Sequence, residues 1–423
     1  MAVNTGPSVL SSPPLSLLSL DGGGIRGVSE PLILDEIMKR IQTHQGLPDT
    51  PKPCEYFDLI GGTGTGGLIA IMLGRLKRST AEALRSYNNL SRVVFQARKP
   101  FDRHGKFKAT ALEKEMKEVI VQAGYNDDQK LLDPNAGKHS RGNVFVCSMT
   151  RVNLHSPQRF RTYRGLPNQG PDCMIWEAVR ATTAGLNVFK PIKITGPGGF
   201  SVDYVGASLE FNNPTQQVRD EAKKLFGNDR RIGVLVSIGT GHTSPHGFRQ
   251  WNRMERALPS ELINVLQSIA TDCERVADEV AKEYDNDDIY FRFNILHGAG
   301  GIPFDEWKKM NELSAHTTSY LRGPEVSKQI DRVVACLCRI QKEWKEWNLV
   351  NRHDSSTMCS EMDQFTIPTV DRFSIKLLKQ ISIGNDYRFH SASHNGKVVA
   401  VKIFEGENAA QVWWLSICPR RQV

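Results

Sequence analysis

The chain has 423 residues, of which 39% are hydrophobic and 24% charged, and its net charge is +8. This composition predicts a folded protein with a sizeable core and excludes a fibrous or disordered chain. No apolar run is long enough to span a membrane, and the N-terminus lacks the basic segment of a signal or transit peptide. The eight scattered cysteines include no C-x-x-C pair. We therefore expect free thiols in a reduced cytoplasmic protein, either soluble or peripheral to a membrane.

Much of the positive charge lies between Arg75 and Lys108, where ten Lys or Arg residues face only Glu82 and Asp102. One interpretation is attraction to an anionic lipid surface, worth about 1 kcal/mol per well-placed cation. The other is a solvated helix face and loop. No nucleic-acid-binding motif accompanies the charge, so we expect no nucleic-acid partner.

Two strand-turn-helix units open the chain. The apolar run at 15–20 predicts a strand, which leads through a glycine turn at 21–27 to a helix at 29–42. The pattern repeats as a strand at 54–62, a turn at 63–67 and a helix at 68–76. Such a succession predicts an α/β fold with a mainly parallel sheet and helices on both faces.

Further strands are predicted at 143–149, 193–206 and 232–241, and further helices at 79–90, 262–284 and 323–347. A polar stretch without periodicity begins near residue 350. We therefore divide the chain into a main domain at 14–350, a linker at 351–362 and a small β-rich extension at 363–423.

The turn at 63–67 has the frame of a hydrolase nucleophile elbow. In the G-x-S-x-G motif, two glycines let a strand turn sharply into a helix, and the serine between them is exposed at the apex. Here the frame glycines Gly62 and Gly66 are present, and Gly64 occupies the nucleophile position. Glycine-rich turns also bind phosphates and dinucleotides, but the flanking buried strand and apolar helix favour the elbow.

The turn at 21–27 contains three successive glycines. Consecutive glycines let several backbone N–H groups point at one spot, where they can hold an oxyanion or a phosphate. The functional interpretation is an oxyanion hole made by Gly22, Gly23 and Gly24, with Arg26 fixing the loop or attracting anionic groups. The structural interpretation is a tight strand-to-helix turn.

Five sequence blocks occur in the order seen in patatin-like phospholipases, and the chain resembles the fungal-type intracellular members of that family. The blocks are LLSLDGGGIRG, YFDLIGGTGTGGLIA, IWEAVRATTAG, VGASLEFNNP and LVSIGTG, within residues 14–350. The resemblance implies a three-layer α/β/α sandwich and the hydrolysis of lipid acyl esters, of phospholipids or acylglycerols, by a Ser-Asp dyad. We expect no cofactor and no metal.

The same resemblance implies that the catalytic acid lies six residues before the first Asn of the NNP block. That position is Gly206, so both dyad side chains, at Gly64 and at Gly206, are missing from this sequence. Asp203 is a candidate substitute acid, but an offset of three residues on a strand turns its side chain to the opposite face. Thr63, Thr65 and Ser208 are candidate substitute nucleophiles without an identifiable base.

Near the C-terminus, the segment GKVVAVKIFEG resembles the β3 strand of a protein kinase N-lobe, with Lys402 as its lysine. The chain holds no catalytic loop and no D-F-G motif, so the resemblance implies a fragment unable to transfer phosphate. A structural addition and an incomplete gene model are both compatible with this pattern.

Three functional hypotheses follow. The first is a patatin-like protein of lipid metabolism whose hydrolase site is catalytically defective, a pseudoenzyme that binds acyl lipids or membrane surfaces. The second is a residual or active lipid ester hydrolase that uses substitute residues. The third is a non-catalytic signalling or interaction module, suggested by the kinase-like fragment.

Overall fold

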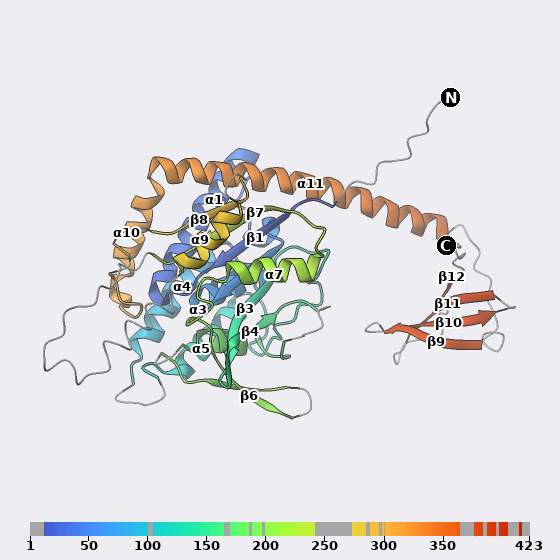
Figure 1. The fold of residues 1–423 in the computed structure, drawn as a ribbon, viewed down its shortest axis with the longest axis horizontal. Coiled ribbons are helices and arrows are strands. Elements are labelled where there is room, and N and C mark those ends of the chain that lie inside the picture. Colours follow the sequence, from blue (N-terminus) through green and yellow to red (C-terminus); the bar gives the residue numbers. More distant parts are fainter. Residues whose placement is uncertain are drawn as a thin grey trace, which may run out of the picture. The chain divides into compact units, whose positions relative to one another are not determined.

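The fold comes from a computed structural model, which describes the greater part of the chain (Figure 1). The described residues are 12–99, 105–164, 170–185, 188–196, 199–241, 273–284, 288–295, 298–299 and 301–363, and the strands at 376–383, 387–394, 397–404 and 414–416. The chain divides into two compact units, residues 1–349 and 350–423. No helix among the described residues is long and apolar enough to cross a membrane.

The first unit is built on an eight-stranded sheet with the order β5-β6-β3-β2-β1-β7-β8, and β4 pairs with β3. Its five-stranded parallel part consists of β1 (Leu15–Leu20), β2 (Leu59–Thr63), β3 (Asn143–Thr150), β7 (Ile232–Ile238) and β8 (Tyr290–Phe293). The antiparallel strands are β4 (Asn153–Arg161), β5 (Ile192–Thr195) and β6 (Ser201–Gly206). The mainly parallel sheet predicted from the sequence is thereby confirmed.

Helices cover both faces of this sheet. A first buried cluster joins one face to α1 (Ser29–Gln45), α3 (Gly64–Ala70), α4 (Thr80–Gln96), α5 (Ala109–Gln122), α6 (Ile175–Thr183), α10 (Met310–Leu321) and α11 (Pro324–Asp363). A second cluster joins the other face to α7 (Thr215–Phe226) and α9 (Glu274–Glu283). This is the three-layer α/β/α sandwich that the sequence predicts.

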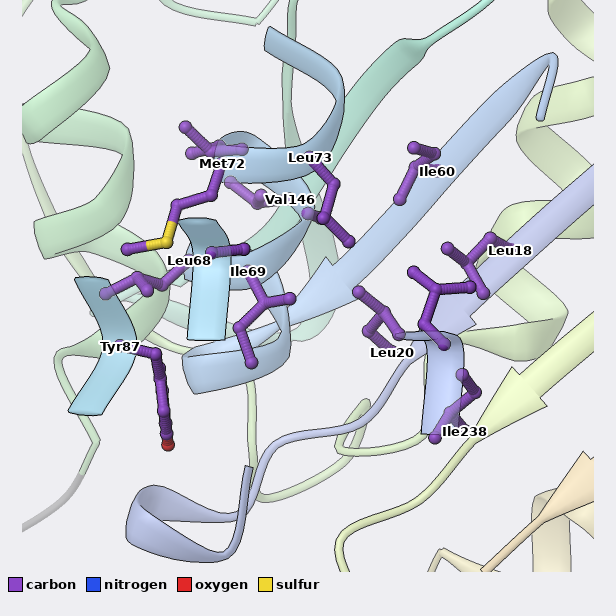
Figure 2. Packing of buried hydrophobic residues seen from close by; sticks show 14 of the residues in the cluster. Leu18, Leu20, Ile60, Leu68, Ile69, Met72, Leu73, Tyr87, Val146 and Ile238 are labelled. Carbon is purple, nitrogen blue, oxygen red and sulfur yellow. The ribbon is translucent and has the colours of Figure 1, made fainter. Parts of the chain in front are cut away.

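The alternation of side chains along β1 explains the two clusters. Leu18 and Leu20 belong to the first cluster, whereas Leu15 and Leu17 belong to the second. Figure 2 shows the first cluster near α3, where Ile69 lies close to residues from several strands and from α4. A strand that is buried on both faces needs mostly apolar residues, and the two buried serines of β1, Ser16 and Ser19, are hydrogen-bonded to Asp58 and Thr215.

Several elements differ from the sequence-based expectation. The single strand predicted at 193–206 is a pair of antiparallel strands, β5 and β6. The helix predicted at 68–76 is the end of α3 followed by a π-helical turn, η2 (Ile71–Arg75). Of the helix predicted at 262–284, residues 262–272 lie outside the described residues. The short elements not predicted include η1 (Gly24–Val28), α2 (Pro53–Tyr56) and η4 (Trp307–Lys309).

The boundary between the two compact units falls inside α11, which continues to Asp363. The segment predicted as a linker, 351–362, is therefore helical. The second unit also contains a four-stranded antiparallel sheet with the order β12-β11-β10-β9. Its strands are β9 (Lys376–Ile383), β10 (Tyr387–His394), β11 (Lys397–Phe404) and β12 (Trp414–Ser416).

Candidate functional site

The turn around Gly64 joins β2 directly to α3. Strand β2 ends at Thr63 and the helix begins at Gly64, whose φ of +57° lies in the left-handed region. Residues other than glycine rarely adopt this conformation, and hydrolase elbows are known for such backbone strain. The backbone therefore has the form of an elbow with glycine at its apex.

The two frame glycines allow the backbone to pack closely at this turn. A Cβ atom at Gly62 would lie 2.4 Å from the Gly66 carbonyl oxygen, and one at Gly66 would lie 2.4 Å from the Asp21 carbonyl oxygen. Both distances are below van der Waals contact with backbone atoms that cannot move aside. Any side chain at these positions would push α3 away from the ends of β1 and β2.

In contrast, the apex itself has room for a side chain. A Cβ atom at Gly64 would lie 3.7 Å from the Gly22 Cα, 3.7 Å from the Ser208 Oγ and 4.0 Å from the Thr182 carbonyl oxygen. The Gly64 N–H donates to the Thr182 Oγ1 at 2.9 Å, and that hydroxyl donates to the Cys147 carbonyl at 2.6 Å. Thr182, at the end of α6, therefore fixes the apex without filling the space in front of it.

The glycine loop at 22–24 lies beside the elbow because Leu20 on β1 pairs with Gly62 on β2. The Gly22 N–H donates to the Asn212 carbonyl at 3.0 Å, and the Gly23 N–H donates to the Thr65 Oγ1 at 3.1 Å. Among the described residues, we find no acceptor for the Gly24 N–H. Of the three N–H groups predicted to form an oxyanion hole, two are thus already bonded within the protein.

Arg26 supports this loop rather than extending into solvent. Its Nε lies 3.4 Å from the Gly23 carbonyl oxygen, to which it donates. Burial lowers the pKa of its guanidinium, and the neighbouring Cys273 and Tyr87 oppose that effect. The Tyr87 hydroxyl donates to the Gly24 carbonyl. The loop is therefore fixed from both sides by buried polar side chains.

An ion-pair network lies behind the loop. The Asp21 Oδ2 accepts a hydrogen bond from Arg292 at 2.7 Å, and Arg292 also binds Glu274 at 2.9 Å. Burial raises the pKa of Asp21, an effect that Arg292 opposes. Glu30 is fully buried nearby, and neither of its carboxylate oxygens has a hydrogen-bond partner among the described residues. Burial, reinforced by the charge of Asp21, raises the pKa of Glu30 well above its ordinary value.

Asn212, from the NNP block, connects the glycine loop to the start of α9. Its carbonyl accepts the Gly22 N–H, and its Nδ2 lies 3.2 Å from the Gly22 carbonyl oxygen and 3.0 Å from the Cys273 Sγ. Burial, together with the charge of Asp21, raises the pKa of the Cys273 thiol well above its ordinary value. A raised pKa disfavours the thiolate, which is the nucleophilic form of cysteine, so we do not expect Cys273 to replace the missing serine.

The predicted acid position, Gly206, ends β6 and faces backbone. A Cβ atom there would lie 2.9 Å from the Thr182 carbonyl oxygen and 3.0 Å from the Gly185 nitrogen. Asp203 lies on the opposite face of β6, the face of Val205, which belongs to the second cluster together with α7. The elbow is on the other side of the sheet, so Asp203 is not brought to Gly64.

The candidate substitute threonines are both occupied by structural contacts. Thr63 is fully buried, and its hydroxyl donates to the Phe211 carbonyl at 2.7 Å. The Thr65 hydroxyl accepts the Gly23 N–H. Ser208, which is half-buried, is the candidate whose hydroxyl faces the apex.

Sequence reasoning missed Thr182 and Arg292 as supports of this site. Thr182 lies in the IWEAVRATTAG block, but no spacing rule indicates that its hydroxyl binds the elbow. Arg292 lies on β8, a short strand that we did not predict. Within the described ranges, His, Cys, Asp and Glu residues form no group of three suited to hold a metal ion.

Comparisons with known proteins show which proteins this site is similar to. Residues 18–219 match the family model described as patatin-like phospholipase. Phospholipase A I of Arabidopsis thaliana is 27% identical over 389 residues, covering 75% of this chain and 27% of that protein. Calcium-independent phospholipase A2-gamma of Oryctolagus cuniculus is 27% identical over 339 residues, covering 76% of this chain and 40% of that protein. The chain thus spans well under half of the length of these two relatives.

A third relative carries a name that bears on catalysis. "Probable inactive patatin-like protein 9" of Arabidopsis thaliana is 26% identical over 219 residues, covering 48% of this chain and 53% of that protein. The family match spans both glycine turns, the α6 block and the NNP block, which together form the site described above. Residues 18–219 of this chain are therefore similar to the patatin-like phospholipase family model across these four blocks.

Proposed function

We propose that this chain is a lipid acyl hydrolase homologue that binds acyl lipids but has lost the chemistry that cleaves them. The observation that carries this proposal is Gly64. It has the left-handed φ of an elbow apex and room for a Cβ atom, but no side chain to attack an ester. Relatives named as phospholipases point to lipids as ligands, and the relative named "Probable inactive patatin-like protein 9" supports a non-catalytic role.

The size of the loss supports a defective site. Removing the nucleophile of a serine hydrolase costs about a millionfold in turnover, or roughly 8 kcal/mol of transition-state stabilisation. Once the nucleophile is absent, the loss of its partner adds little, because the two groups act as a unit. Glycine at both Gly64 and Gly206 is thus compatible with an intact fold and with the absence of catalysis.

The second candidate is an active or residual hydrolase that uses substitute residues. Asp203 is on the wrong face of β6, and Thr63 and Thr65 hold backbone groups. Ser208 is the observation that favours this candidate, because its hydroxyl faces the apex. A serine hydroxyl needs a base to become a nucleophile, and within the described ranges we find no hydrogen bond from the Ser208 hydroxyl to a carboxylate or an imidazole.

A hydrolysis assay on the purified chain separates the two candidates. We expect no turnover of p-nitrophenyl esters or phospholipid vesicles above a Ser208→Ala control. We also expect binding of a short-chain phosphatidylcholine below its micelle concentration, measured by calorimetry. Turnover at rates normal for esterases would refute the loss of chemistry, and absence of lipid binding would refute the lipid-binding role.

We further propose that the protein acts in the cytoplasm and reaches lipid at an anionic membrane surface. Next to the glycine loop, the Phe304 carbonyl accepts the Ile25 N–H at 2.7 Å, and the Phe304 side chain is 37% exposed. Lys106 lies 5.9 Å from the Phe304 ring, and Lys106 and Arg98 pair with the neighbouring Asp305. We define the basic rim as the cations of the two segments that meet at Asp305, namely Arg98, Lys99, Lys106, Lys108, Lys308 and Lys309.

Among the described residues of these two segments, the acids are fewer than the cations of the basic rim. Asp305 is nearly buried and pairs with Arg98 at 3.3 Å and with Lys106. Glu306 and Glu312 are the other acids in the segment around η4, which packs against α4. The rim therefore keeps a net positive charge beside an exposed aromatic ring, a combination suited to anionic headgroups.

Vesicle binding tests this membrane role. Losing two cations worth about 1 kcal/mol each weakens binding by about 30-fold. Lys308→Glu/Lys309→Glu should therefore reduce binding to phosphatidylserine-containing vesicles by at least that factor. The matched control is Lys223→Glu/Lys224→Glu on α7, on the other face of the sheet, which should have little effect. Equal losses for both pairs would refute a role for the rim.

The C-terminal unit supports a further proposal, that of an interaction module. Its antiparallel sheet includes β11, and Lys402 lies on this strand. The resemblance to a kinase N-lobe also implies a strand at Lys402. The kinase-like origin of this unit and the fungal type of the main domain stand as proposals from the sequence. Removing residues 364–423 and measuring partner capture and thermal stability tests whether the unit contributes to either.

A further inference from the structure

We propose that two hairpin tips of the first unit, which carry Val152 and Phe200, insert into the acyl-chain region of a lipid bilayer and hold the elbow against it. The inference rests on the membrane role proposed above, but its residues are different from those of the basic rim. Both side chains are apolar and exposed, and both lie past the edge of the sheet at which the elbow is found.

The register of the sheet places both tips at that edge. Strand β2 ends at Thr63, where the elbow begins, whereas its neighbour β3 continues beyond that level to Thr150, alongside β6. Val152 follows in the turn between β3 and β4. Thr150 pairs with Tyr204, and Phe200 precedes β6 on the far side of this pair. At about 3.3 Å per strand residue, Phe200 extends roughly 10 Å past the end of β3. In Figure 1, β6 lies below β3 and β4.

The exposed apolar side chains of the first unit gather at this edge. Val152 is 94% exposed and Phe200 is 81% exposed. Five large hydrophobic side chains are exposed among the described residues, and a third of this group is Phe304, beside the glycine loop that follows β1. Strand β2, which leads into the elbow, lies between β1 and β3. Single exposed apolar side chains are common in soluble proteins, but these three flank the elbow on both sides.

The turn that carries Phe200 holds several of its polar groups within itself. The Gly196 N–H donates to the Phe200 carbonyl at 2.9 Å, and the Gly199 N–H donates to the Gly196 carbonyl at 3.2 Å. The hydroxyls of Thr195 and Ser201 lie 2.9 Å apart and share a hydrogen bond across the base of the turn. Backbone groups that enter lipid need partners within the protein, because no water is available to them there. These bonds therefore lower the cost of insertion.

The charge at the two tips suits a bilayer surface. Residues 150–153 and 195–201 contain no Asp or Glu, so insertion buries no carboxylate. Arg151 is exposed, and its backbone N–H donates to the Asp203 carbonyl at 2.9 Å, which joins the two hairpins. Lys193 on β5 is also exposed. Long cationic side chains next to inserted apolar groups keep their charge at the level of the headgroup phosphates.

A bilayer fits these tips better than a protein partner does. A stable protein interface buries about 1,200–2,000 Å² in total, and two side chains on protruding turns supply little of that area. Lipid chains are fluid and close around separate protrusions, so each inserted side chain contributes by itself. Burying one phenylalanine side chain changes an equilibrium constant by about 10- to 100-fold.

Vesicle sedimentation tests this anchor with phosphatidylcholine vesicles that contain phosphatidylserine. Phe200→Ser should weaken binding by about 10-fold or more, whereas Phe200→Trp should retain it. The same fold-loss is expected at low and high salt, because salt does not screen apolar insertion. The matched control is Val121→Ser on α5, at a side chain that is 56% exposed, and it should have little effect. Equal losses for the two serine variants, or none for Phe200→Ser, would overturn the inference.

Fluorescence quenching reports insertion directly. Phosphatidylcholine brominated on its acyl chains quenches tryptophan only at close approach, so Phe200→Trp should lose more emission on such vesicles than the unsubstituted chain loses. Val121→Trp adds a tryptophan at the control site and should show no additional loss. Additional quenching at both sites, or at neither, would overturn the inference. Both side chains are exposed, so thermal unfolding should be the same for all four variants.

The anchor and the basic rim can fail separately. Vesicle binding that responds to Lys308→Glu/Lys309→Glu but not to Phe200→Ser keeps the rim and rejects the anchor. A chain that binds no vesicles rejects both. Calorimetry with the short-chain phosphatidylcholine below its micelle concentration involves no bilayer, so it judges lipid binding at the elbow independently of either surface.

Discussion

Glu30 is a carboxylic acid that the fold keeps buried without a hydrogen-bond partner among the described residues, and replacing it should stabilise the protein. It lies in the first turn of α1, just after the glycine loop, and it is fully buried. Because burial and the charge of Asp21 raise its pKa well above the ordinary value of 4.5, the folded state keeps a proton over a pH range in which the unfolded state has already released it. Stability therefore falls as the pH rises above the unfolded pKa.

The magnitude follows from the pH interval. For each pH unit between the pKa of Glu30 in the unfolded state and its pKa in the folded state, the free energy of unfolding falls by about 1.4 kcal/mol. Between pH 4.5 and pH 7 the upper limit is about 3.5 kcal/mol, reached when the folded pKa lies above 7. Glu30→Gln removes the ionisation while keeping the shape, so it should be more stable than the natural chain by an amount that grows with pH.

Urea unfolding followed by circular dichroism between pH 4 and pH 8 measures this difference. Glu36→Gln on the same helix is the control. Its carboxylate pairs with Arg40 at 2.8 Å in a partly exposed position, so its loss should change stability little at any pH. A difference between Glu30→Gln and the natural chain that stays flat with pH, or that favours the natural chain, would refute the reasoning.

Two further predictions concern the supports of the site. In urea unfolding, Gly206→Ala should lower the free energy of unfolding by about 1–3 kcal/mol, because its Cβ atom would meet backbone atoms. The control is Gly301→Ala, whose Cβ atom would meet no heavy atom within 4 Å, and it should change the free energy of unfolding by less than about 1 kcal/mol. Equal effects would contradict the close packing at Gly206. Arg292→Met should lower the free energy of unfolding by about 3–5 kcal/mol, because it leaves the buried Asp21 carboxylate without its ion pair. The control is Arg275→Met, at a side chain that is 65% exposed, and it should change the free energy of unfolding by less than about 0.5 kcal/mol. A loss below 1 kcal/mol for Arg292→Met would refute the importance of the pair.

The glycine turns and their surrounding elements could be predicted because their signals are local. An apolar run followed by glycines and a periodic helix has one common structural solution, and the two such units at β1 and β2 were enough to indicate a parallel sheet. The position of Gly64 in the chain, at the junction of strand and helix, follows from the same pattern.

What the sequence did not reveal depends on long-range geometry. The bond from Gly64 to Thr182 joins residues 118 positions apart, and the pair of Asp21 with Arg292 joins residues 271 positions apart. The direction of the side chain at Gly206 depends on where the end of α6 packs, which no spacing rule describes. The single strand predicted at 193–206 was wrong because Thr195 and Ser201 end two strands that pair antiparallel.

The left-handed backbone at Gly64 has a consequence for how easily such a protein can change its activity. A serine held in that conformation costs about 1–3 kcal/mol of strain, which glycine does not incur. The chain without a nucleophile is therefore expected to be more stable than a catalytic form with the same fold. Activity and stability are opposed at this one residue, so a mutation that removes the serine is favoured wherever lipid binding alone is under selection.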